Sequence, residues 1–143
     1  MTTDTAAQDK PRALPQTKGS LVPYLMLSDA GAASAFYQKA FGAVEVTRMP
    51  APDNADKLIH VHLYLNDHSL MLNDPMPEHG YPLVPQQGCT LTLMVDDIDA
   101  WFARAVDAGA TVTMPVQRMF WGDRYGALKD PFGVQWAMNE GAK

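Results

Sequence analysis

Within residues 58–65, LIHVHLYL, apolar and polar residues alternate from Ile59 onward, near the middle of the chain. The aliphatic set is Ile59, Val61, Leu63 and Leu65, and the opposite set is His60, His62 and Tyr64. A period of two is typical of a half-buried strand, whose side chains point alternately to its two faces. The stretch therefore predicts a strand with one face against a core and a polar, aromatic face toward a cavity.

Helical periodicity appears twice, once in each half of the chain. Each apolar stripe follows an aspartate that can cap a helix, Asp29 or Asp97, and ends before a glycine, Gly42 or Gly109. The stripes consist of Ala33, Phe36, Tyr37, Ala40 and Phe41, and of Ile98, Trp101, Phe102, Ala105 and Val106. The caps are 68 residues apart and the glycines 67. This nearly constant offset predicts a duplicated module with one helix in each copy.

Short apolar segments surround both stripes and read as strands. SLVPYLML, VEVTRM and SLMLN accompany 58–65 in the first half, and CTLTLMV, TVTM, the stretch from Phe120 and VQWAM do so in the second. Both halves thus run strand, helix, strand, strand, strand. We expect an α+β fold of two βαβββ modules, in which the helices cover one face of curved mixed sheets and the other faces enclose a cleft.

The 143 residues correspond to about one domain. Residues 1–19 are polar, small and proline-containing, which predicts a disordered leader. Residues 20–140 are expected to form a single domain, made of module 20–75 and module 88–140. The Pro- and Gly-rich residues 76–87 would join the two modules.

Charge and cysteine content narrow the possible partners and the location. The formal net charge is −5 and Lys and Arg never cluster, so neither nucleic acid nor an anionic membrane is an expected partner. No apolar run approaches the roughly 18 residues of a membrane span. The single cysteine, Cys89, fits a reducing compartment. We therefore expect a cytoplasmic protein, with Cys89 as a small buried hydrophobe.

The two strand histidines, His60 and His62, are the first candidates for chemistry. They are two residues apart, so both rings project from the same face. They could act as two ligands of a metal that takes a third ligand from elsewhere, as a general base, or simply as hydrogen-bonded cleft or interface histidines. Tyr64 and Tyr24 could line the same cavity.

The stretch FWGDRYGALKDPFGVQW, residues 120–136, combines aromatic residues, an Asp-Arg pair and turn residues. Its DPFG portion fits a type I turn that delivers the last strand in register. Asp123 and Arg124 either pair with each other, satisfy loop amides or contact a ligand. Trp121 could stack on a flat ligand at a cavity mouth, and Gln135 is predicted to face the cleft. The stretch as a whole is expected to serve mainly as scaffold.

Four motifs, PYLMLSD…AFYQKAFGA, LYLNDHSLMLND, VDDIDAWFARAVDAGA and FWGDRYGALKDPFGVQW, resemble the glyoxalase/bleomycin-resistance/extradiol-dioxygenase group, the vicinal oxygen chelate (VOC) superfamily, and within it the PhnB-like branch. The resemblance covers about residues 20–140. It implies the paired βαβββ fold of glyoxalase, bleomycin-resistance protein and dihydroxybiphenyl dioxygenase. It also implies a homodimer, since many members of the superfamily are homodimers with the cleft formed between two modules.

Metal-dependent members place four ligands, chiefly His and Glu, on strands that face the cleft. In this sequence the corresponding positions fall at about Val22, at about Thr90, at Ala137 and within SLMLND, where Met71, Leu72 and Asn73 stand. None of these side chains binds a divalent metal well. The resemblance therefore implies a relative without the usual metal, and we expect neither a metal site nor another cofactor.

The sequence favours a small-molecule-binding protein that lacks the usual metal tetrad and holds a small organic ligand in its cleft. The expected ligand-binding residues are His60, His62, Tyr64, Trp121, Asp123, Arg124 and Gln135. The alternative is a metal-dependent lyase, isomerase or dioxygenase with a displaced metal on His60 and His62. A third possibility is a module that serves only protein interaction. Whether the protein is an enzyme stays open at this point.

Overall fold

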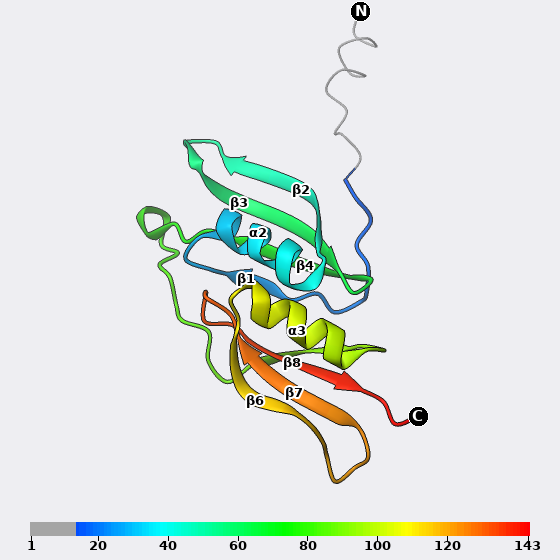
Figure 1. The fold of residues 1–143 in the computed structure, drawn as a ribbon. Helices are drawn as coiled ribbons and strands as arrows, with labels where there is room; N and C mark the ends of the chain where they lie inside the picture. Colours follow the sequence, from blue (N-terminus) through cyan, green and yellow to red (C-terminus); the bar gives the residue numbers. More distant parts are fainter. Residues whose placement is uncertain (1–13) are drawn as a thin grey trace, which may run out of the picture.

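Two four-stranded sheets and two α-helices make up the computed structural model, which describes residues 14–143 (Figure 1). The first module contains β1 (Tyr24–Met26), α2 (Ala30–Phe41), β2 (Val44–Ala51), β3 (Asn54–Leu65) and β4 (His68–Asn73). The second contains β5 (Thr90–Met94), α3 (Ile98–Ala108), β6 (Thr111–Arg118), β7 (Arg124–Lys129) and β8 (Gln135–Glu140). A short 3-10 helix, η1 (Pro77–His79), lies in the connector. The predicted pair of βαβββ modules is confirmed.

The sheets have the same strand order in both modules. The order is β1-β4-β3-β2 in the first sheet and β5-β8-β7-β6 in the second. In each sheet the first strand of the module pairs in parallel with the last, while the other pairs are antiparallel. Both sheets are therefore mixed, as predicted. The edge strands β1 and β5 belong to separate sheets, so the modules are joined by side chains and by the connector.

The helices lie side by side in front of the two sheets (Figure 1). Asp29 and Asp97 cap them by accepting from the backbone N–H of Ala32 and Ala100. Gly42 ends α2 with φ of +70°, a conformation that favours glycine. No helix within residues 14–143 is long and apolar enough to cross a membrane.

The alternation in 58–65 holds for most of β3. Val61, Leu63 and Leu65 are buried in the core that α2 covers, and His62 lies on the opposite face. The prediction for Ile59 was wrong: this residue is 36% exposed, and Leu58 is buried in its place. The pairing with β2 jumps from His60 to Leu58 between Met49 and Pro50, which leaves Ile59 as the extra residue of a β-bulge. Such a bulge exchanges the two faces of the strand beyond it.

A buried carboxylate joins the two modules. Asp130 is 5% exposed and accepts hydrogen bonds from the Tyr37 hydroxyl at 2.5 Å and from the Trp136 indole N–H at 2.9 Å. It also accepts from the backbone N–H groups of Phe132 and Val134. Its carbonyl accepts from Gly133 N–H, which closes the expected four-residue turn. Because Tyr37 lies on α2, the DPFG turn links the first module to the second.

Cys89 is exposed, contrary to the prediction of a buried hydrophobe. It stands just after the connector, one residue before β5 begins at Thr90. Its neighbour Gly88 has φ of +68°, a turn conformation outside the sheet. The thiol therefore precedes the strand whose packing would have buried it.

Candidate functional site

Three predicted ligand-binding residues, His60, His62 and Tyr64, follow one another along the polar face of β3. The ring centroids of His60 and His62 are 6.3 Å apart, and those of His62 and Tyr64 are 5.2 Å apart. Each ring has its own partner. The Tyr24 hydroxyl lies 2.7 Å from His60 Nδ1, and the Ser69 hydroxyl lies 2.7 Å from His62 Nε2. The trio is therefore an ordered aromatic row held by hydroxyl groups.

The N-terminal segment covers one end of this row. The Tyr64 hydroxyl donates to the carbonyl of Gln16 at 2.6 Å, and Lys18 N–H donates to Ser69 Oγ at 2.8 Å. The Lys18 ammonium lies 4.3 Å from the Tyr64 ring centre and 3.0 Å from a carboxylate oxygen of Asp67. Residues 1–13 of the predicted leader lie outside the described residues, whereas Gln16 and Lys18 contact the sheet. His62, only 2% exposed, is thus closed off from solvent.

The metal site of the VOC superfamily does not fit the residues present. Thr90, Ala137 and Met71 lie on β5, β8 and β4 and offer neither imidazole nor carboxylate. Within residues 14–143 no group of three or more His, Cys, Asp or Glu side chains could hold a metal ion. The two histidines of β3 have no such third ligand among these residues, and each is bonded to a separate hydroxyl.

We expect an NMR titration of the His62 ring to give a pKa below the ordinary value of about 6.5. Burial lowers the pKa of His62, and the neighbouring His60 lowers it further. Below pH 6.5 the unfolded chain then binds more protons than the folded chain, so the free energy of unfolding should decrease as the pH falls toward the folded-state pKa. His62→Gln should reduce this acid sensitivity. A His62 pKa at or above 6.5 would contradict the expectation.

Trp121, Asp123 and Arg124 gather elsewhere, around the β6–β7 hairpin. Arg124 makes two hydrogen bonds to the carboxylate of Asp99 on α3, at 2.7 and 2.9 Å. Asp123 accepts from Asn139 Nδ2 and from the backbone N–H of residue 142, contacts that keep the pKa of its carboxyl below the ordinary range. Trp121 is 48% exposed and packs edge-on against Tyr125. The Asp123 and Arg124 side chains thus brace the hairpin.

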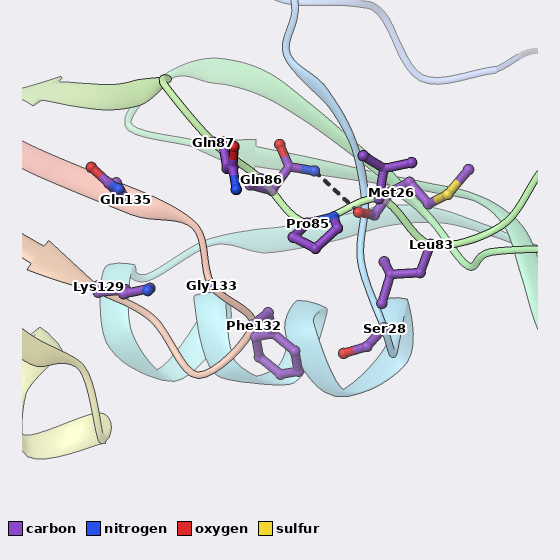
Figure 2. A pocket seen from close by; sticks show the side chains of 11 residues that line it. Met26, Ser28, Leu83, Pro85, Gln86, Gln87, Lys129, Phe132, Gly133 and Gln135 are labelled. Carbon is purple, nitrogen blue, oxygen red and sulfur yellow. Dashed lines mark hydrogen bonds between the residues drawn. The ribbon is translucent and has the colours of Figure 1, made fainter.

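The pocket that receives Gln135 lies where the connector crosses between the two modules (Figure 2). Its volume is about 340 Å³. Met26 of β1 and residues 83–87 of the connector line it together with Lys129 and Gln135, which pair across β7 and β8. Gln86 is fixed by a hydrogen bond of 3.2 Å to the carbonyl of Met26. We call this hollow the connector pocket.

Of the seven predicted residues, Gln135 is the one that lines the connector pocket. Met26, Lys129 and residues 83–87 were not predicted. Lys129 is directly opposite Gln135 in the β7–β8 pair, so both side chains project from one face of the second sheet. Met26 belongs to the other sheet, and no register relates it to Gln135. The contribution of the connector left no comparable signal, since a proline-rich segment has no periodicity to read.

The chain matches the sequence model of a known protein family over most of its length. The model of the Glyoxalase/Bleomycin resistance protein/Dioxygenase superfamily matches residues 20–138. The chain belongs to this superfamily. The resemblance predicted from the sequence motifs is thereby confirmed at the level of the superfamily, and the paired modules are its fold.

Individual proteins are similar to this chain over most of their length. Uncharacterized protein Rv0887c of Mycobacterium tuberculosis is 44% identical over 127 residues, which cover 85% of this chain and 74% of the relative. The structure of PA1353 from Pseudomonas aeruginosa is 29% identical, with a TM-score of 0.71, and the match covers 86% of this chain and 98% of that one. TnmS3, an antibiotic binding protein from Streptomyces sp. CB03234, is 23% identical with a TM-score of 0.65, and the match covers 92% and 100%. The last likeness is one of fold.

Proposed function

We propose that this member of the glyoxalase/bleomycin-resistance superfamily binds a small organic molecule in the connector pocket without a bound metal. The observation that carries the proposal is the pocket itself, of about 340 Å³ and lined from both modules. Volumes of this order are typical of small-molecule sites. The superfamily's ligand positions lack metal donors, so binding would rest on packing and hydrogen bonds.

The chemistry of the lining indicates the kind of ligand. Met26, Leu83, Val84, Pro85 and Phe132 offer apolar surface. The glutamine side chains at 86, 87 and 135 offer amide donors and acceptors at the margin. Among the lining residues that the structure describes, Lys129 carries the single formal charge. We therefore propose a flat, largely apolar ligand with a polar or anionic end placed at Lys129 and Gln135.

The fold is compatible with this use. TnmS3, which has the same fold, is an antibiotic binding protein by its name, so the paired modules can hold a small molecule. At 23% identity this likeness concerns the scaffold alone, and the support for the ligand class is the lining of the connector pocket.

The other predicted ligand residues enter the proposal through a homodimer. Phe120 is 97% exposed and packs edge-on against Trp121 at the tip of the β6–β7 hairpin. Exposed aromatic pairs of this kind are enriched at interfaces. We propose that a second copy covers this tip, which would bring Trp121 within reach of a bound ligand. We propose that the row of His60, His62 and Tyr64, which lies outside the connector pocket and partly behind the N-terminal segment, supports the dimer cleft rather than holding a metal.

Native mass spectrometry with 1-naphthoate as the probe tests ligand and assembly together. We expect two chains per particle and one probe per chain, with calorimetry giving an affinity that EDTA leaves unchanged. Gln135→Trp should fill the pocket and abolish binding, and Lys129→Gln should weaken it roughly fivefold by removing the charge. Lys39→Gln, on the last turn of α2, is the matched control and should bind as the parent does.

Two results would overturn the proposal. One is the failure of both 1-naphthoate and its uncharged amide to bind the parent protein. The other is binding that requires a divalent metal and is lost in His60→Ala. The second result would favour the metal-dependent enzyme instead.

A further inference from the structure

A smaller hollow shares Met26 with the connector pocket. It has a volume of about 180 Å³ and is lined by Met26, Ile59, Asn73, Asp74, Met76 and Tyr81. The loop between Met76 and Tyr81 forms one wall. It is closed by two backbone hydrogen bonds, from Met76 N–H to the Tyr81 carbonyl at 2.7 Å and from Tyr81 N–H to the Met76 carbonyl at 3.0 Å. Ile59 reaches this hollow because the bulge in β3 turns it away from the core. We call it the Asn73 pocket.

Asn73 brings a buried oxygen with unused hydrogen-bonding capacity to this pocket. Its Oδ1 is the one buried side-chain nitrogen or oxygen within residues 14–143 that has no hydrogen-bond partner. Each oxygen of the adjacent Asp74 carboxylate already has a partner, the backbone N–H of Ala30 or of Leu58. Buried polar atoms are nearly always satisfied, so an unpartnered one calls for a specific explanation.

The internal duplication provides the comparison. Asn139 holds the same place in the second module: it pairs with Met94 as Asn73 pairs with Met26. Both asparagine carbonyls accept from the residue that follows the first strand, Leu27 or Val95. Asn139 donates its Nδ2 to Asp123 at 3.0 Å. In the first module the Asn73 side chain makes no hydrogen bond to any residue within 14–143, so the carboxamide is not held as that of Asn139 is, and its oxygen is left to accept from a group outside the chain.

We infer that the Asn73 pocket binds a small apolar ring that carries one N–H or O–H donor, which the Asn73 oxygen accepts. A cavity of about 150 Å³ with an apolar lining is enough to hold benzene, so the volume suits a single ring. Oδ1 lies beneath the lining, and a donor reaches it when neighbouring side chains shift. Met26 and Met76 are unbranched and adapt to such a shift. This inference goes beyond the proposed function because it concerns a different pocket.

Phenol and toluene are the probes, since they share a ring and differ in the donor. Binding is measured by NMR of methionine and isoleucine methyl groups in the full chain. We expect phenol to bind roughly tenfold more tightly than toluene, with shifts at Met76 and Ile59. Asn73→Leu should bind toluene as well as the parent protein does and lose the preference for phenol. Asn73→Ala serves as a second variant with the same expectation.

Two control variants make the outcome specific. Ile59→Trp should fill the pocket and abolish binding of both probes, while Asn139→Leu should keep the preference for phenol. Equal affinity for phenol and toluene in the parent protein would overturn the role of Asn73. Shifts confined to the connector pocket would overturn the Asn73 pocket and leave the proposed function standing. Binding of phenol in the Asn73 pocket without any binding of 1-naphthoate would support the Asn73 pocket and overturn the proposed function.

Discussion

Replacing Asp130 by alanine is expected to lower the free energy of unfolding by about 3–5 kcal/mol. The carboxylate accepts four hydrogen bonds, two from backbone N–H groups of its own turn and two from the Tyr37 hydroxyl and the Trp136 indole. Tyr37 and Trp136 are almost completely buried, so water cannot replace the lost acceptor without opening the core. Urea denaturation followed by circular dichroism should show a lower midpoint with an unchanged slope.

Tyr37→Phe separates the tyrosine's contribution from that of the whole network. This variant removes one donor and leaves the turn intact, so a loss of about 1–2 kcal/mol is expected. The parent protein should also lose stability above pH 10, because burial and the nearby Asp130 raise the pKa of Tyr37 above its ordinary value of about 10. The folded chain then holds a proton that the unfolded chain releases. An Asp130→Ala midpoint equal to that of the exposed-site variant Asp56→Ala would contradict the assigned role.

The secondary structure could be predicted from sequence because its signals are local. Asp29 and Gly42 delimit α2 as the capping pattern indicates, and Asp97 and Gly109 do the same for α3. The duplication predicted the repeated order of elements, which the structure has in both halves. The family motifs added the pairing of the modules. The helix caps and the strand periodicities depend on residues close together in the chain.

Ile59 and the connector show what local patterns miss. The bulge that turns Ile59 outward depends on how β3 pairs with β2 across a register shift. The connector pocket depends on residues 83–87 packing against Met26 and Gln135, partners from different modules. Neither fact is contained in the periodicity of a single segment.

Two of the predicted ligand-binding residues, Asp123 and Arg124, form hydrogen bonds within the protein instead. Arg124 and Asp123 have the side chains of a binding site, yet their charges and donors are taken up by Asp99 and Asn139. Composition alone cannot distinguish a side chain that is free for a ligand from one that is satisfied by a distant strand or helix. Asn73 is the opposite case. Nothing in the sequence around it indicates that its side-chain oxygen has no hydrogen-bond partner in the described part of the fold.

Replacing Asp74 by alanine is expected to cost about 2–4 kcal/mol of unfolding free energy. One oxygen accepts from Ala30 N–H at 2.7 Å, at the start of α2, and the other from Leu58 N–H at 2.8 Å, beside the bulge of β3. The residue is 6% exposed, so both donors would be left without a partner. Its position also fixes the end of β4, and Asp74→Ala should therefore weaken the preference of the Asn73 pocket for phenol. Urea denaturation measures the first effect and methyl NMR the second.

Glu140 is the matched control, because it takes the place of Asp74 in the second module. Its carboxylate accepts one backbone hydrogen bond, from Ile98 N–H at 3.0 Å at the start of α3, and it is more exposed than Asp74. Glu140→Ala should therefore cost about 0.5–1.5 kcal/mol and leave the phenol preference unchanged. Equal losses in the two variants would mean that the bond to Leu58 contributes nothing. The difference between them measures what the first module gains by tying its helix to the bulge that directs Ile59 into the pocket.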